Sequence, residues 1–374
     1  MSHTYSEFLP SYSVGVDCYK AIPEIVKPYG KKAVAVGGKT AMEKSKKALL
    51  EGIKGSDIEI IDFVWYGGDS SYENVEKIKN NPSVQKADMV FGIGGGRAVD
   101  TAKTYCALYN KPLFTFPTIA SNCASCTSLS VMYNTDGTFK EYSYHKAPAI
   151  HTFINTKIIA ESPEKLMWAG IGDALSKEYE VIFACREKNM IHTPLLGRAI
   201  ASASTEPLIS FGKKALEDCK NNVPTEAIEQ VALAIIITAG LVSNFTVHEN
   251  NPNPEEDYYY NSSLAHCVYY GASLFPQCER QHLHGEIVSF GVLCLLTYDG
   301  QFEERNRIFE FNHSIGLPCT LGEIALTPDD VPAIAHKAAS VVEWKYVPGN
   351  PTEDAFINAI LATDKAGKEF LADK

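Results

Sequence analysis

The spacing of apolar residues changes near residue 158, and this change constrains the fold more than any other feature. The first 155 residues alternate short apolar runs with amphipathic stretches, the pattern of a parallel sheet whose strands are joined by helices. The expected strands are 33–36, 58–65, 89–93 and 113–116, and the expected helices between them are 41–51, 72–80 and 99–109. The rest of the chain has helical periodicity without a convincing strand. We therefore expect an α/β domain at 1–158 and an all-helical domain at 159–374, with a ligand site in the crevice between them.

A hairpin is expected near the end of the first domain. The apolar residues of 129–133 and 139–144 alternate with polar ones and flank Asp136-Gly137. Asp-Gly between two such runs predicts two antiparallel strands joined by a tight turn. Residues 149–155 then close the sheet-like part of the chain.

Charge and composition narrow the classes of partner. The net charge of −11 argues against nucleic acid, because phosphate binding needs clustered lysine and arginine. No apolar run reaches the ~18 residues of a membrane span, and the longest candidate, 231–242, contains Thr238 and Gly240 and is expected to be a buried core helix. The ten cysteines have no framework spacing and the first residues lack a secretory signal. We expect a cytoplasmic protein with reduced thiols and a small-molecule substrate.

One glycine-rich turn has the composition of a phosphate-binding loop. Gly94, Gly95 and Gly96 follow an apolar strand and precede a helix, so that backbone N–H groups and the helix N-terminus could approach a phosphate. Gly38 follows the first strand in a second such turn. The spacing is not G-x-G-x-x-G, so a tight turn without a ligand remains the alternative.

Three polar residues interrupt small and apolar segments of the second domain. They are Asp173, His266 and His284. The alternatives are a helix cap or buried acceptor for Asp173, a satisfied core histidine for His266 and a helix-capping histidine for His284. Two imidazoles and one carboxylate from three helices would leave open positions on a divalent ion, which is the ligand count of a catalytic metal site.

Five segments in the same order resemble one enzyme family. They are Gly-Gly-Gly-Arg-Ala-Val-Asp-Thr-Ala-Lys at 94–103, Phe-Pro-Thr-Ile-Ala-Ser at 116–121, Gly-Ile-Gly-Asp-Ala-Leu at 170–175, Leu-Ala-His at 264–266 and His-Gly-Glu at 284–286. With them the chain resembles the iron-containing alcohol dehydrogenase superfamily and its glycerol dehydrogenase branch. The resemblance implies the dehydroquinate synthase-like fold, with an α/β dinucleotide-binding domain followed by an all-α metal-binding domain. It also implies a homo-oligomer.

The resemblance assigns roles to particular residues. It implies that Asp173, His266 and His284 are the metal ligands, with zinc usual in the glycerol dehydrogenase branch and iron elsewhere. It implies that the cofactor pyrophosphate lies at Gly94, Gly95 and Gly96. The residues implied around the nicotinamide half are Thr118, Ser121, Thr127, Leu129 and Tyr133. Asp100 and Lys103 complete the glycine-turn motif, and a purely structural role is the alternative for Asp100. The implied reaction is hydride transfer between an alcohol and a nicotinamide, assisted by the metal.

The chain departs from this branch at the adenosine end of the cofactor. NAD-linked glycerol dehydrogenases have an aspartate where this chain has Gly38, followed by Lys39. Without the carboxylate a 2′-phosphate is no longer repelled, and Lys39 could pair with it. This favours NADP(H), with NAD(H) as the alternative.

The substrate side departs as well. An aspartate that faces the polyol in glycerol dehydrogenases aligns with Cys123, which is similar to the hydroxycarboxylate dehydrogenases that reduce 2-oxo acids. Glycerol-like diols and 2-hydroxy acids therefore stay rival substrates, and a redox or metal-binding pair with Cys126 is a further reading of the cysteine. The range 247–257 looks longer than the family's loop and contains His248, which is either a surface or a pocket residue.

Two other functions share this fold. One is a carbon–oxygen lyase like the dehydroquinate synthases, whose phosphate-binding lysine and arginine residues are not found here, since Lys177 is the only basic residue near Asp173. The other is a dinucleotide-binding protein without catalysis, which an intact set of metal ligands argues against.

Overall fold

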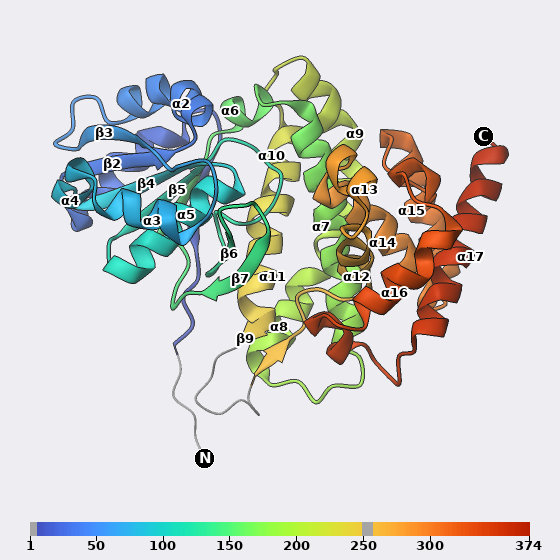
Figure 1. The fold of residues 1–374 in the computed structure, drawn as a ribbon. Coiled ribbons are helices and arrows are strands. Elements are labelled where there is room, and N and C mark those ends of the chain that lie inside the picture. The colour runs from blue at the N-terminus through green and yellow to red at the C-terminus, as the bar shows by residue number, and fades with distance from the viewer. Residues whose placement is uncertain (1–5, 249–256) are drawn as a thin grey trace. The chain divides into compact units, whose positions relative to one another are not determined.

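The computed structural model describes residues 6–248 and 257–374, and these residues form two compact units (Figure 1). The first comprises Met1–Leu166 and Ala215–Asn244, and the second comprises Met167–Lys214 and Phe245–Lys374. The boundaries fall inside α7 (Glu164–Ala184), α9 (Thr205–Lys220) and α11 (Ala239–Thr246). The predicted class, an α/β part with a helical C-terminal part, is confirmed. The sequence analysis expected a single domain boundary at residue 158. The observed units differ from this expectation, because residues 215–244 pack with the α/β unit.

The α/β unit is built on a six-stranded parallel sheet. Its strands are β1 (Ser11–Val14), β2 (Lys32–Gly37), β3 (Glu59–Trp65), β4 (Met89–Gly94), β5 (Leu113–Pro117) and β8 (His151–Ile154), in the order β1-β8-β5-β4-β2-β3. The connecting helices include α2 (Lys39–Gly52), α3 (Tyr72–Lys79), α4 (Pro82–Lys86), α5 (Gly96–Tyr109) and α6 (Thr156–Ala160), and η1 (Cys18–Ala21), α1 (Ile22–Val26) and η2 (Lys27–Tyr29) precede β2. Strands β2, β3, β4 and β5 and helices α2, α3 and α5 follow the sequence prediction. β1 was not expected, because this short edge strand is half exposed and has no apolar run.

Both faces of β2, β4 and β5 are buried, which explains the continuous apolar runs of these strands. One face packs the rings of Phe91, Phe114, Phe116 and Phe153, with Phe116 stacked on Phe153 at 4.9 Å between centroids. The other face carries aliphatic side chains of β2 and β4 against α3 and α5. Because the strands are parallel, their carboxyl ends lie along one edge, where Gly37 is paired with Ile93, and Gly94 with Pro117.

The predicted hairpin forms a separate two-stranded sheet. β6 (Leu129–Tyr133) pairs antiparallel with β7 (Phe139–Tyr144) across the Asp136-Gly137 turn. Gly137 has φ +87°, and the Asp136 carboxylate accepts the Thr138 N–H at 2.9 Å. The turn chemistry that the sequence indicated is therefore the one observed.

One long apolar helix runs through α10 (Glu226–Leu233), the π-helical η3 (Ala234–Thr238) and α11. By length and composition this 21-residue stretch, Glu226–Thr246, could cross a membrane. However, 72 % of its apolar window is buried inside the protein, as in the core helix of a soluble protein. It extends beyond the predicted range 231–242, and Gly240 lets it pack closely on Cys126.

The second unit is helical. Besides most of α7 and part of α9, its helices are α8 (His192–Ala201), α12 (Leu264–Ala272), α13 (Pro276–Gln281), α14 (His284–Tyr298), α15 (Phe302–Ile315), α16 (Val331–Ala338) and α17 (Glu353–Ala372), with 3-10 turns η5 (Gly322–Ile324), η6 (Pro328–Asp330) and η7 (Val342–Tyr346). The two-residue strands β9 (Val247–His248) and β10 (Tyr258–Tyr259), too short for a periodic signal, form an unexpected antiparallel pair. Most of the loop 247–257 lies outside the described residues, although His248 is half-buried with its ring against Tyr258.

Candidate functional site

The three predicted metal ligands come together in the helical unit. Asp173 lies in the middle of α7, His266 in α12 and His284 at the first position of α14. One ligand atom of each residue lies within 4.8 Å of the ligand atoms of the other two. Among the described residues, these three form the one group of His, Cys, Asp or Glu side chains that is close enough to hold a metal ion. The Asp173 carboxylate is 3.2 Å from Nε2 of His284 and 3.7 Å from Nε2 of His266. The geometry therefore assembles one carboxylate oxygen and two imidazole nitrogens around one point.

Glycines beside these ligands allow the helices to approach closely. A Cβ at Gly172 would lie 2.3 Å from the carbonyl oxygen of Gly285, and a Cβ at Gly285 would lie 1.9 Å from that of Ala169. A Cβ at Gly291 would lie 2.3 Å from the Ala265 carbonyl oxygen. Real side chains do not reach such distances, so only glycine permits α7 and α12 to lie this near α14. The glycines near the ligands in the sequence thus allow the three helices that carry the ligands to pack closely together.

A buried carboxylate that the sequence analysis missed orients His266. Glu180 is fully buried on α7, two turns after Asp173. One of its oxygens lies 2.6 Å from Nδ1 of His266, and the other accepts the backbone N–H groups of Ser263 and His266 at 2.7 and 2.9 Å. An acceptor at Nδ1 favours the tautomer with its proton there, which leaves the Nε2 lone pair toward Asp173. The signal in the sequence was a second acidic residue at helical spacing from Asp173 in an apolar helix.

Electrostatics at the site favour a cation. Burial raises the pKa of Asp173, but the hydrogen bond from His284 and the charges of both histidines outweigh it and lower that pKa to about 2. Asp173 is therefore a carboxylate at neutral pH, which is the state that binds metal. Lys177, buried one turn from Asp173, donates to the backbone and side-chain oxygens of Asn261 at 3.2 and 3.0 Å.

The structure argues against a capping role for Asp173 and against a fully satisfied core histidine at His266, whereas the other alternative for Asp173, a buried acceptor, is compatible with its 3.2 Å contact to His284. Asp173 is inside a helix rather than at its end, and His266 has only one nitrogen hydrogen-bonded. At the start of α14 the cap is Glu286, which accepts the Leu283 N–H at 3.0 Å and lies 2.8 Å from Nδ1 of His282. His284 instead lies 3.2 Å from Asp173, and its ring makes a T-shaped contact with Tyr269 at 4.1 Å between centroids.

The predicted cofactor residues lie at the carboxyl edge of the sheet in the α/β unit. Gly94 ends β4 with φ +140°, Gly95 caps α5 and Gly96 begins it. Gly38 caps α2 beside them and donates to Ile93 at 3.3 Å, and the Thr118 N–H after β5 donates to Gly94 at 3.4 Å. Ser121 follows on the same loop. This edge is where open α/β sheets bind their ligands.

The remaining predicted contacts belong to the segment that leads into the hairpin. Thr127 is buried, Leu129 begins β6 and Tyr133 ends it under the guanidinium of Arg97, 5.0 Å from the ring centroid. Cys123 is partly exposed in a turn closed by the Cys126 N–H, which donates to its carbonyl at 2.9 Å. Burial raises the pKa of the Cys126 thiol, which argues against Cys126 as a reactive thiolate.

Comparisons with known proteins agree with these features. Residues 10–154 match the family model of iron-containing alcohol dehydrogenases. A glycerol dehydrogenase of Thermotoga maritima is 31 % identical over 316 residues, covering 81 % of each chain, and hydroxycarboxylate dehydrogenase A of Escherichia coli is 29 % identical, covering 87 % of this chain and 85 % of that one. The crystal structure of a Schizosaccharomyces pombe glycerol dehydrogenase superposes with a TM-score of 0.85 at 24 % identity, covering 100 % of this chain and 93 % of that chain.

The protein is thus an alcohol oxidoreductase by class. It belongs to the iron-containing alcohol dehydrogenase superfamily, in the glycerol dehydrogenase-like branch.

Proposed function

We propose that the chain is a metal-dependent, NAD(P)-linked oxidoreductase that interconverts an alcohol and its carbonyl compound. The observation that carries this proposal is the convergence of Asp173, His266 and His284 with Glu180 behind one of the imidazoles. Relatives named glycerol dehydrogenase and hydroxycarboxylate dehydrogenase support it.

The donor set fits a divalent cation such as zinc, with iron as the alternative. Nε2 of His266 is 3.7 Å from Asp173, which is too long for a hydrogen bond, so a buried lone pair is left for another partner. Three protein ligands of the nitrogen and oxygen type suit zinc and leave a position for substrate. The fit therefore rests on a buried, unsatisfied nitrogen of His266 rather than on the residue types alone.

Each residue of the site has a definable task in this reaction. When bound, the metal would lower the pKa of a substrate hydroxyl or polarise a carbonyl, while a nicotinamide would exchange the hydride. Glu180 orients His266 and holds the proton of the neutral ring on Nδ1, so that Nε2 can serve as a ligand, and the Tyr269 ring packs against His284. The backbone N–H groups after Gly94 and the N-terminus of α5 would hold the cofactor phosphates.

The surroundings of Lys39 support NADP(H) over NAD(H). Its ammonium lies over the Trp65 ring, 4.5 Å from the centroid, beside a surface hollow of about 320 Å³ that Lys46 also lines. Glu43 in the same hollow is the one opposing charge. Gly38 has φ −70° and a Cβ there would make only ordinary contacts with Ala41 and Tyr66, so Gly38→Asp can supply the missing carboxylate without strain.

This preference is tested by measuring Kd for NADPH and NADH in two variants. Lys39→Ala should weaken NADPH binding about tenfold, the value of one charge-assisted contact, with little change for NADH. Gly38→Asp should reverse the preference. Equal affinities for both cofactors in all three proteins would remove the argument for NADP(H).

Two substrate classes remain within the proposal, glycerol-like diols and 2-hydroxy acids. Cys123 in place of a carboxylate makes a substrate anion easier to accept, because a like charge is absent from that position. The assay is the change in nicotinamide absorbance with dihydroxyacetone and with 2-oxoglutarate, using NADH and NADPH and protein of known metal content. Turnover of dihydroxyacetone alone would eliminate the hydroxy-acid reading.

The same assay tests the whole proposal with a matched pair of variants. His284→Gln removes a proposed ligand, whereas His282→Gln removes a histidine two residues earlier that contacts Glu286 instead. We expect activity to be lost only in the first variant. No net change in absorbance with any carbonyl substrate would favour the lyase or the non-catalytic alternative.

We also propose a small-molecule substrate, a homo-oligomeric state and a cytoplasmic location, with neither nucleic acid nor membrane as partner. The net charge of −11 and the buried apolar helix support the two exclusions. Light scattering of the purified protein tests the oligomeric state, and a monomer mass of 41.0 kDa would refute it.

A further inference from the structure

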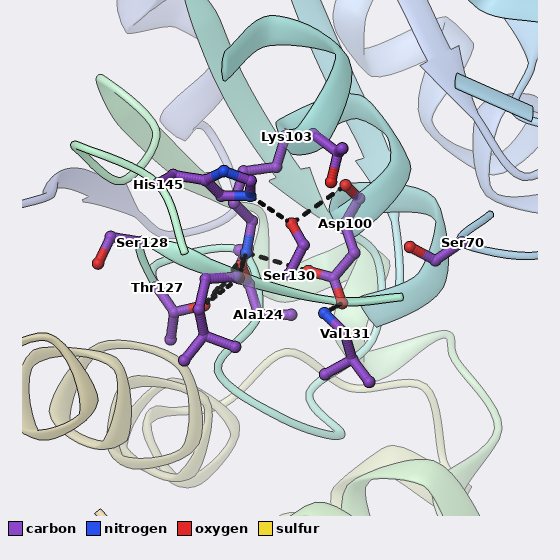
Figure 2. A network of polar contacts seen from close by, with 12 residues as sticks. Ser70, Asp100, Lys103, Ala124, Thr127, Ser128, Ser130, Val131 and His145 are labelled. Atoms are coloured by element: carbon purple, nitrogen blue, oxygen red, sulfur yellow. Dashed lines mark hydrogen bonds and ion pairs between the residues drawn. The ribbon is translucent and has the colours of Figure 1, made fainter. Parts of the chain in front are cut away.

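A buried ion pair on α5 makes polar contacts with the segment 124–131 (Figure 2). Lys103 and Asp100 are one helical turn apart, with 3.0 Å between the ammonium nitrogen and a carboxylate oxygen. Their side chains are only 3 % and 6 % exposed. Burial of two charges costs several kcal/mol unless hydrogen bonds satisfy both, so the partners of this pair indicate what it does.

All the hydrogen bonds of Lys103 go to one segment. Its ammonium donates to the carbonyl of Ala124 at 2.7 Å, to the hydroxyl of Thr127 at 3.1 Å and to the carbonyl of Leu129 at 2.5 Å. An ammonium has three N–H donors, so these acceptors use all of them. The near oxygen of Asp100 receives no hydrogen bond and serves as the counter-charge.

Asp100 holds the next part of the same segment. Its second carboxylate oxygen accepts the Val131 N–H at 3.2 Å, and its backbone carbonyl accepts the hydroxyl of Ser130 at 3.2 Å. The Ser130 hydroxyl also lies 2.8 Å from Nε2 of His145, as Figure 2 shows. Contacts from two residues of α5 therefore run along 124–131, with Thr127 and Leu129 among the groups held.

We propose that Asp100 and Lys103 are positioning residues that fix the nicotinamide-binding segment to the helix that begins at the glycine turn. This inference rests on the proposed function, in which Gly94–Gly96 hold the pyrophosphate, and Thr127 and Leu129 contact the nicotinamide half. Helix α5 starts at Gly96, so one rigid element carries both halves of the dinucleotide site. The pair would preorganise the segment before the cofactor binds and thereby spare the cost of ordering it.

A merely structural pair makes a different prediction. A pair that only stabilised the α/β unit would, when broken, weaken every ligand of that unit or none. A positioning pair should affect the cofactor according to whether it carries a nicotinamide. ADP-ribose tests this, because it retains the adenosine and the pyrophosphate but lacks the nicotinamide.

The experiment measures Kd for NADH, NADPH and ADP-ribose by calorimetry in the full-length protein with its metal. The variants are Lys103→Met and the milder Asp100→Asn, which keeps an acceptor for Val131 but removes the counter-charge. Lys111→Met is the matched control, because Lys111 also donates to a backbone carbonyl of the α/β unit, that of Ala87 at 2.5 Å, outside the segment. Thermal unfolding accompanies each titration.

We expect Lys103→Met to weaken the better-bound nicotinamide cofactor about tenfold or more, since buried acceptors lose their donors, and to leave ADP-ribose within about twofold. Asp100→Asn should have the same selectivity with a smaller effect, and Lys111→Met should change neither ligand. Equal weakening of cofactor and ADP-ribose in both variants, or no change in either, would overturn the inference. If the unmodified protein binds ADP-ribose but neither nicotinamide cofactor, the proposed function fails instead.

Discussion

The candidate phosphate site of the α/β unit is made of glycines and backbone N–H groups at the ends of parallel strands, whereas the candidate metal site of the helical unit is made of side chains. Gly38 and Gly94 need no side chain of their own. The proposed ligands Asp173, His266 and His284 would act only through theirs, and Glu180 contacts one of them. Under the proposed function, single substitutions should therefore be tolerated unequally, because many backbone contacts would share the binding energy in one unit and three side chains would concentrate it in the other.

The largest expected effect comes from a ligand of the helical unit. Asp173→Asn preserves shape but removes the charge, and we expect kcat to fall about a thousandfold, since several kcal/mol of stabilisation come from such a cation. Thr118→Val in the α/β unit should change the Kd of the cofactor less than about tenfold. Steady-state kinetics and cofactor titrations measure the two, and comparable losses in both variants would break the contrast.

The helix approach at the site should be the next most sensitive feature. Gly285→Ala places a Cβ 1.9 Å from the Ala169 carbonyl oxygen, so α14 must move away from α7, and we expect a loss of about 2–4 kcal/mol in unfolding free energy. Gly322→Ala is the control, because a Cβ at that position meets nothing within 4 Å. Urea unfolding of both variants gives the comparison, and an equal, small loss in each would mean that α7 and α14 need not lie so close.

The support behind His266 should matter less than the ligands themselves. Glu180→Gln keeps an acceptor but removes the charge next to Nδ1, and we expect metal affinity to fall about 10- to 100-fold. Glu178→Gln is matched to it, since Glu178 lies on the same helix and accepts the Thr205 N–H at 3.3 Å. Competition with a chelator measures both affinities, and an unchanged affinity in Glu180→Gln would remove its orienting role.

The smallest effect concerns acid stability of the α/β unit. His151 lies between the hydroxyls of Ser11 and Ser13 at 2.7 and 2.9 Å, and burial lowers its pKa to about 4. The unfolded chain binds a proton near pH 6.5 and the folded chain does not, so stability falls as pH drops from about 6.5 to 4. His151→Asn should reduce this loss by about 1–2 kcal/mol between pH 7 and 5. Urea titrations at both pH values test it, and an unchanged slope would contradict the assignment.

The sequence predicted the parts of the fold that have strong local signals. The central strands are continuous apolar runs, and the hairpin has an Asp-Gly turn, so both were found. The edge strand β1 and the pair β9–β10 have no such signal, because their pairing partners are distant or the strands are only two residues long. The grouping of 215–244 with the α/β unit depends on tertiary packing that periodicity cannot reveal.

The residues of the candidate site were likewise predicted where the sequence has a local signal and missed where it has none. Asp173, His266 and His284 stood out because polar residues are unusual in small and apolar helices, and the structure brings them together. Glu180 was missed because its role depends on the rotation of α7 relative to α12. The hydrogen bonds of Lys103 to the segment 124–131 could not be predicted, because its acceptors are mostly backbone carbonyls, which any residue type carries.

Metal content is the most direct test of the central claim, that these three side chains hold one divalent cation. Elemental analysis of the purified wild type, of His284→Gln and of His282→Gln, after equal dialysis, compares a proposed ligand with its neighbour. The account predicts about one zinc or iron per chain in the wild type and in His282→Gln, and a large loss in His284→Gln. Equal metal content in all three proteins, or none in a folded wild type that still oxidises or reduces its substrate, would contradict it.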